Sequence, residues 1–178
     1  MIKYEYANSE FYENNKNFCK QIEEEFASTN CLFDGYCNSY GFEIKTKYSY
    51  KKIEYFLELV KKQSTQNGVV IPIDAIDYYE FTLKIKGLSK DIQFEIGKSS
   101  LKRLFMKTIF KNKIPAPFYL KAKKSFTIET IDDLVSTLIT NQTEKLKLSK
   151  GNLSYKTHFL SETPLEFIKL LTDKFKGK

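Results

Sequence analysis

The stretch at residues 146–167, LKLSKGNLSYKTHFLSETPLEF, contains the signals that decide the fold. Residues 146–148 and 153–155 each alternate apolar with polar side chains, and the turn-forming sequence SKGN at 149–152 separates them. Alternation with a period of two is typical of a strand with one buried face, and the turn joins two such strands. The stretch therefore predicts a β-hairpin.

A helix start follows this hairpin at residues 163–166 (TPLE). It combines an N-cap threonine, a proline at the first helical position and a reciprocal acid. The same order of an alternating strand, a Ser or Thr and an amphipathic pattern occurs at Phe42–Ile44 before Ser49, Phe94–Ile96 before Ser99, and Phe126–Ile128 before Thr130. We therefore expect an α+β fold of repeated β-hairpin–helix units, forming an antiparallel or mixed sheet with helices largely on one face.

The first half of the chain gives the following elements. Ser9 is the N-cap of a predicted helix that ends near Asn30. Residues 32–33 and 42–44 flank a turn signal and predict a hairpin. A second helix is predicted from Ser49, because the apolar residues that follow have helical spacing. These residues are Ile53, Phe56, Leu57 and Val60.

The second half begins with a short strand at 69–73, which Pro72 confines to an edge or a strand end. Residues 81–85 and 92–96 alternate and predict a second hairpin. Further predicted elements are a third helix from Ser99 or Ser100 to about Lys111, strands at 118–122 and 126–128, and a helix capped by Thr130.

Composition favours one folded domain. The chain has 178 residues, of which 42% are hydrophobic and 15% aromatic. We expect a single α+β domain over 1–178, with a candidate subdomain boundary near 64–78. No secretion signal and no apolar segment of about 20 residues is present, and three cysteines do not make a disulfide framework. A soluble cytoplasmic protein is therefore expected.

The formal net charge is +7, and the positive charge is uneven along the chain. Residues 84–124 carry many lysines against only Asp91 and Glu95. This asymmetry predicts an acidic partner, either a protein surface or a nucleic acid. Arg103 is the only arginine, so bidentate contacts to phosphate are scarce.

The third predicted helix is the most basic segment and the candidate binding site. Its basic residues are Lys98, Lys102, Arg103, Lys107 and Lys111. Four-residue spacing places several of them along one arc, and apolar residues cover the rest. This pattern suits an acidic protein, nucleic acid or peripheral membrane contact, and a core helix with solvated lysines gives the same pattern.

Strand alternation also predicts a lysine-bearing sheet face. If the leucines, isoleucines and phenylalanines point to the core, Lys45, Lys84, Lys121 and Lys147 point away from it. Such a face could contact phosphates. The alternative is that the lysines only keep exposed strands from associating edge to edge.

One segment resembles an enzyme family. Asp34, followed by Glu43 and Lys45 on the next strand, then by a helix and an apolar strand, resembles the core of the PD-(D/E)xK nuclease superfamily. That resemblance implies that Asp34 and Glu43 bind Mg²⁺ and that Lys45 orients or deprotonates the attacking water. The proline that usually precedes the aspartate is replaced by Phe33.

Outside this segment no complete catalytic, metal or cofactor motif is present. We therefore expect a non-enzymatic binding or adaptor module that recognises an acidic partner through its lysines. The alternatives are a metal-dependent nuclease and an immunity-type or structural partner that blocks another protein.

Overall fold

The computed structural model describes residues 1–62, 65–66, 69–70, 78–106, 114–122 and 132–176. Within these ranges, nine strands form one sheet, and the edge strand β1 is parallel to β2 whereas the other neighbours are antiparallel. In order across the sheet, the strands are β1 (Ile2–Tyr4), β2 (Phe33–Asn38), β3 (Gly41–Tyr50), β4 (Ile53–Lys62), β7 (Tyr78–Lys86), β11 (Asn152–Thr157), β10 (Lys145–Ser149), β8 (Phe94–Lys98) and β9 (Phe118–Ala122). Strands β5 (Thr65–Gln66) and β6 (Val69–Val70) pair separately.

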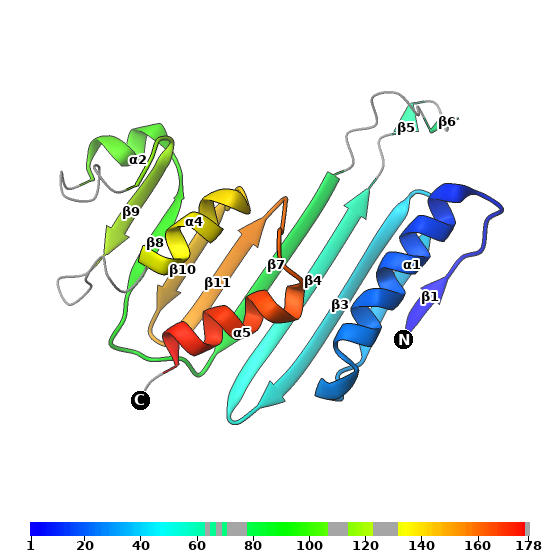
Figure 1. The fold of residues 1–178 in the computed structure, drawn as a ribbon, viewed down its shortest axis with the longest axis horizontal. Helices are drawn as coiled ribbons and strands as arrows, with labels where there is room; N and C mark the ends of the chain where they lie inside the picture. The colour runs from blue at the N-terminus through cyan, green and yellow to red at the C-terminus, as the bar shows by residue number, and fades with distance from the viewer. Residues whose placement is uncertain (63–64, 67–68, 71–77, 107–113, 123–131, 177–178) are drawn as a thin grey trace.

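Three helices, α1 (Glu10–Glu25), α4 (Asp132–Thr140) and α5 (Pro164–Phe175), lie on one face of the large sheet (Figure 1). The short helix α2 (Ser100–Leu104) lies at the β9 end, and the 3₁₀ turn η1 (Ala27–Thr29) follows α1. The expected α+β class, with a mixed sheet and helices largely on one face, is confirmed. The repeated hairpin–helix unit is not confirmed. Among the described helices, none is long and apolar enough to cross a membrane.

The helix starts expected from capping residues are present. The hydroxyl of Ser9 accepts a hydrogen bond from the backbone N–H of Tyr12, and that of Ser99 accepts one from Lys102. Pro164 occupies the start of α5. The two serine hydroxyls accept hydrogen bonds from otherwise free N–H groups of a first helical turn. Proline has no N–H group, so none is left without a partner at its position. Helix α2 ends at Leu104, and the predicted continuation through 107–111 lies outside the described residues.

The helix predicted from Ser49 is wrong, because its residues form strand β4. Lys51 and Lys52 have φ values of 47° and 67° and form the turn from β3. Tyr55, Leu57 and Leu59 are buried on the helix side of the sheet, and Phe56 points to the other side. Ten residue pairs join β3 and β4. The helical spacing arises by chance. Alternate residues of the same segment, such as Tyr55, Leu57 and Leu59, are also apolar, and this is the pattern of a strand.

The hairpin predicted from residues 81–85 and 92–96 is also wrong. Strand β7 pairs with β4 and β11, whereas β8 pairs with β10 and β9. Two strands from the end of the chain therefore separate β7 from β8. The predicted strand at 126–128 and Thr130, the predicted N-cap of the next helix, lie outside the described residues, as does 71–73 of the predicted strand at 69–73.

The core lies between the sheet and its helices. Phe81, Leu83 and Ile85 of β7 are all 0% exposed, as the alternation predicted. Phe167 of α5 packs on the rings of Phe81 and Tyr155. This packing leaves the side chains on the other side of each strand facing away from the helices.

The β9 edge of the sheet is partly covered by α2. Arg103 donates hydrogen bonds from Nη1 to the carbonyl oxygens of Ile114 and Phe118, each at 2.6 Å. The sulfur of Met106 lies 3.0 Å from the backbone nitrogen of Leu120, which donates to it. Engaged backbone groups cannot pair with another chain, so this edge is protected from strand addition.

Candidate binding surface on the open face of the sheet

The side of the sheet opposite α1, α4 and α5, here called the open face, carries the lysines that alternation predicts. The register aligns one residue from each of β3, β4, β7, β11, β10, β8 and β9 in a single transverse row. In this order the residues are Lys47, Phe56, Lys84, Ser154, Lys147, Glu95 and Lys121. Neighbouring strands are about 4.8 Å apart, so the row has fixed spacing. We call its four lysines, Lys47, Lys84, Lys121 and Lys147, the lysine row.

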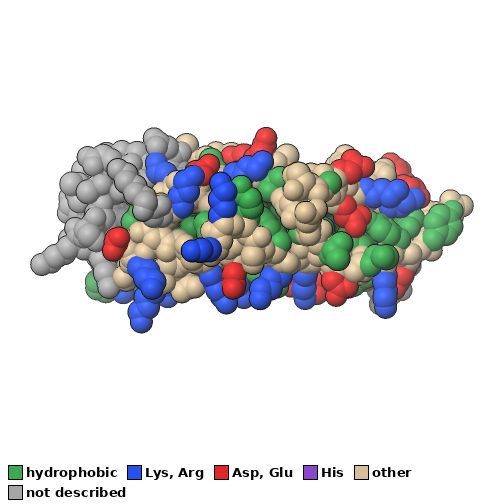
Figure 2. Space-filling model, turned by 90° about the horizontal axis from the view of Figure 1, so that it is seen from below, with side chains coloured by type: hydrophobic (Ala, Val, Ile, Leu, Met, Phe, Trp, Pro, Cys, Tyr) green, Lys and Arg blue, Asp and Glu red, His purple; other side chains and the backbone are tan. Residues whose placement is uncertain are grey.

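The lysine row is not neutralised by the protein's own carboxylates. Within the described part of the chain, none of its four lysines forms an ion pair. The ammonium group of Lys84 lies 5.4 Å from the centre of the Phe56 ring, within the range of a cation–π contact. Figure 2 shows basic side chains projecting along the lower border of the molecule, with carboxylates between them.

Three other lysines of the open face, Lys45, Lys86 and Lys156, are paired. Lys45 Nζ lies 2.7 Å from Glu43 and 3.1 Å from Glu58. The two carboxylates raise the pKa of Lys45, chiefly through the hydrogen bond to Glu43 and then that to Glu58. Lys86 pairs with Glu54 at 3.7 Å, and Lys156 with Glu80 at 2.9 Å and Glu144 at 3.4 Å. Around these pairs, on β3, β4, β7 and β11, the open face is therefore a mixture of both charges.

A shallow hollow interrupts the open face beside the lysine row. It has a volume of about 240 Å³ and is lined by Phe56, Lys47, Lys84, Lys86 and Glu54 among others. An apolar floor with cationic groups at its rim can receive the stem and the head of an acidic side chain. The hollow is thus a potential anchor point on a flat surface.

A polar cluster lies where α2 meets β8 and β9. The hydroxyl of Tyr119 donates to Glu95 Oε1 at 2.5 Å, and Lys102 Nζ lies 3.0 Å from both groups. The hydrogen bond from Tyr119, followed by that from Lys102, lowers the pKa of Glu95 to about 2. Burial raises the pKa of Tyr119. Glu95 is therefore an anion at neutral pH, and Lys102 is engaged with it.

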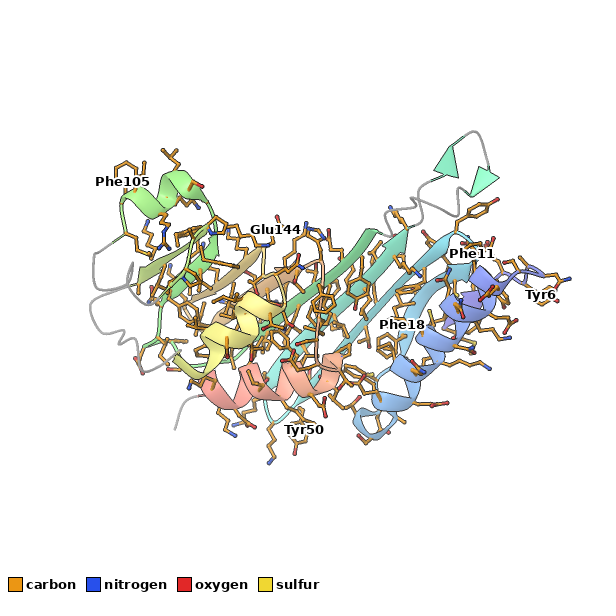
Figure 3. All side chains as sticks on the ribbon, turned by 45° about the horizontal axis from the view of Figure 1, so that its top comes forward. Tyr6, Phe11, Phe18, Tyr50, Phe105 and Glu144 are labelled. Atoms are coloured by element: carbon orange, nitrogen blue, oxygen red, sulfur yellow. The ribbon has the colours of Figure 1, made fainter. Side chains whose placement is uncertain are left out.

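The predicted binding residues of the third helix have different environments. Lys98 is exposed, with its ammonium group 5.6 Å from the ring centre of Phe118. Lys102 and Arg103 bind the groups described above and hold α2 against the sheet. Lys107 and Lys111 lie outside the described residues. In Figure 3, Phe105 projects outward at the end of α2, and it is 85% exposed.

The residues that resemble a nuclease site lie on neighbouring strands. Asp34 is directly opposite Lys45, and its carboxylate lies 3.4 Å from the N-terminal nitrogen. Lys45 is held by Glu43 and Glu58. The helix that the resemblance requires after Lys45 is replaced by strand β4. Across the described ranges, no three His, Cys, Asp or Glu side chains are arranged to hold a metal ion. The nuclease activity itself stays a prediction.

Three residues of this surface, Glu54, Phe56 and Glu58, were not predicted from the sequence. All three follow Ser49, where a helix was predicted. Their alternation with the buried residues Tyr55, Leu57 and Leu59 was the signal that could have placed them on one strand face.

Comparison with protein families, curated proteins and solved structures finds no family model, no curated protein and no solved structure that matches this chain.

Proposed function

We propose that this protein is a non-enzymatic binding module whose open face holds an acidic region of a partner protein. The observation that carries the proposal is the lysine row, in which Lys84, Lys121 and Lys147 lack carboxylate partners in the described structure. The strands fix the spacing of the Cα atoms from which these lysine side chains project. Because the strands are already ordered, binding of a partner costs less backbone conformational entropy here than it would on a flexible loop.

The surrounding charges favour a protein over a nucleic acid. Glu43, Glu54, Glu58 and Glu80 lie on the same face and repel a continuous phosphate backbone. A protein surface can instead place its own bases opposite these carboxylates. Complementary charges of both signs fix the orientation of a partner.

The aromatic and arginine side chains support the same choice. The Tyr119 hydroxyl is bonded to Glu95, and the Phe56 ring lies beside the ammonium group of Lys84. The single arginine donates to backbone carbonyl oxygens. The open face thus offers little of the base stacking and bidentate phosphate binding that nucleic-acid surfaces use.

The test measures binding of three fluorescent probes by anisotropy over a range of salt concentrations. The probes are a glutamate-rich peptide, a DNA duplex and a single-stranded RNA. We expect the peptide to bind, and the affinity to fall as salt screens the lysines.

The diagnostic variant is Lys84→Glu/Lys147→Glu, and the matched control is Lys20→Glu/Lys90→Glu, which changes the net charge equally at exposed sites away from the row. The first variant should weaken peptide binding by about tenfold or more, since it removes two attractions and adds two repulsions. The control should bind like the wild type. Equal loss in both variants, tighter binding of either nucleic acid, or no salt-dependent binding would overturn the proposal.

A further inference from the structure

A groove lies on the other side of the sheet, between α5 and the β3–β4 hairpin, with the chain around η1 as its second wall. Its volume is about 990 Å³, at the upper end of the range of small-molecule sites. Tyr48, Ile53 and Tyr55 form its floor, and Leu165 and Ile168 face it from α5. We call it the α5 groove. Figure 3 shows Tyr50, which is 60% exposed, at the lower border of the molecule near α5.

The floor contains polar atoms that the protein does not use. The rings of Tyr48 and Tyr55 are stacked, with centroids 4.7 Å apart and an interplanar angle of 9°. Tyr55 is only 4% exposed. Neither hydroxyl has a hydrogen-bond partner in the described structure. Among the described residues, Asn15 Oδ1 is the one enclosed side-chain polar atom without a partner, so the two tyrosine hydroxyls reach solvent and are donors available to a ligand.

The Tyr48 hydroxyl is a donor over the physiological pH range. Burial, followed by the neighbouring Tyr55 and Cys31, raises the pKa of Tyr48. The proton therefore stays on the oxygen, which can donate it to an anion.

The rim of the groove is cationic. Lys51 and Lys169 line it, are exposed, and form no ion pair within the described ranges. Lys176 also lines the groove and is paired with Asp173 at 2.5 Å. Lys47 also lines the groove and has no ion pair in the described structure, so three lysines without ion pairs face the one aspartate among the described lining residues. An anionic head group is thus favoured here.

We infer that the α5 groove binds a small amphiphile with an aliphatic chain and a carboxylate, such as a medium-chain fatty acid. The chain would cover Ile53, Leu165 and Ile168, while the carboxylate accepts hydrogen bonds from the tyrosine hydroxyls and pairs with Lys51 or Lys169. Each CH₂ group that leaves water adds to the affinity through the hydrophobic effect.

This inference does not depend on the proposed protein-binding function. The groove is on the helix-covered side of the sheet, and three lysines of the row, Lys84, Lys121 and Lys147, do not line it, although Lys47 does. A negative result in the test of one proposal therefore does not contradict the other.

Cys31 lines the groove and provides a direct readout. It is partly exposed, whereas Cys19 and Cys37 are both 0% exposed. Burial also raises the pKa of the Cys19 and Cys37 thiols, which lowers their reactivity further. Iodoacetamide, which is uncharged, should therefore alkylate Cys31 first, and mass spectrometry identifies the modified residue.

The experiment follows Cys31 alkylation with increasing decanoate, below the concentration at which it forms micelles. Decyltrimethylammonium, which has the same chain and the opposite charge, is the matched probe. Decanoate should slow alkylation several-fold at saturation, and the cationic probe should not. Circular dichroism verifies that the fold is intact at each concentration.

The rim is tested with Lys51→Glu/Lys169→Glu. The decanoate concentration that gives half-maximal protection should rise by about tenfold, as expected when both cationic side chains that could pair with the carboxylate become anionic. The control Lys20→Glu/Lys90→Glu should keep the wild-type value. The inference is overturned by no protection, by equal protection from both probes, or by an unchanged concentration in the rim variant.

Discussion

The two faces of the sheet differ in what their side chains do, although the same strands supply both. On β7, Leu83 is 0% exposed against the helix layer, and its neighbour Lys84 is exposed on the open face. Side chains on the covered face leave water on folding, whereas those on the open face stay hydrated. Stability therefore resides mainly on the covered face, and the open face can carry binding residues at little cost to the fold.

The largest effect should come from truncation on the covered face. Leu83→Ala should lower the free energy of unfolding by about 2–5 kcal/mol, because it removes buried methyl groups and leaves a cavity. Urea denaturation followed by circular dichroism measures the change. The adjacent substitution Lys84→Ala should change this free energy by less than about 0.5 kcal/mol. Similar losses for both would show that the faces do not differ as described.

An intermediate effect is expected at Glu95, the most shielded carboxylate of the open face. Glu95→Gln should lower the free energy of unfolding at neutral pH by about 1–2 kcal/mol, because the charge-assisted hydrogen bonds from Tyr119 and Lys102 are weakened. Urea titrations over a range of pH values measure this dependence.

The sign of the pH dependence follows from the lowered pKa of Glu95. Its value falls from 4.5 to about 2 on folding, so the ionised group stabilises the fold above about pH 4.5. This contribution is lost as the pH falls towards 2. The acid-induced loss of stability should thus be smaller in Glu95→Gln than in wild type. Glu24→Gln, at an exposed position of α1, should retain the wild-type slope.

The smallest effect should occur at the paired lysine of the open face. Lys45→Met should lower the free energy of unfolding slightly at low salt, since it leaves Glu43 and Glu58 without their shared cation. High salt should reduce the difference. The matched substitution Lys47→Met, on the same strand but without an ion pair in the described structure, should have no such cost. A salt-independent loss in both would point to altered packing instead of charge pairing.

Part of the candidate surface could be predicted from the sequence. Strand alternation alone placed Lys45, Lys84, Lys121 and Lys147 on the side away from the core, because successive side chains of a strand point to opposite faces. It could not show which of these lysines are neutralised. Lys45 meets Glu58 only because β4 is a strand beside β3.

The α5 groove could not be predicted, because its residues are brought together from distant parts of the chain. Tyr48 and Tyr55 come from the hairpin that was predicted to contain a helix. Leu165 and Ile168 come from the last helix, more than one hundred positions later. No pattern within a short stretch of the sequence indicates that these residues are close in space.

The sequence by itself determined the helix starts at Ser9 and Pro164, the hairpin of β10 and β11, and the inward and outward faces of most strands. These are local features, set by capping hydrogen bonds, fixed proline geometry and side-chain alternation. The tertiary structure alone decided that β11 and β10 separate β7 from β8, and that residues 53–62 are a strand. The apolar pattern of 53–62 fits both a helix and a strand. Its hydrogen bonds to β3 and β7, with burial of Leu57 and Leu59 under the helix layer, stabilise the strand.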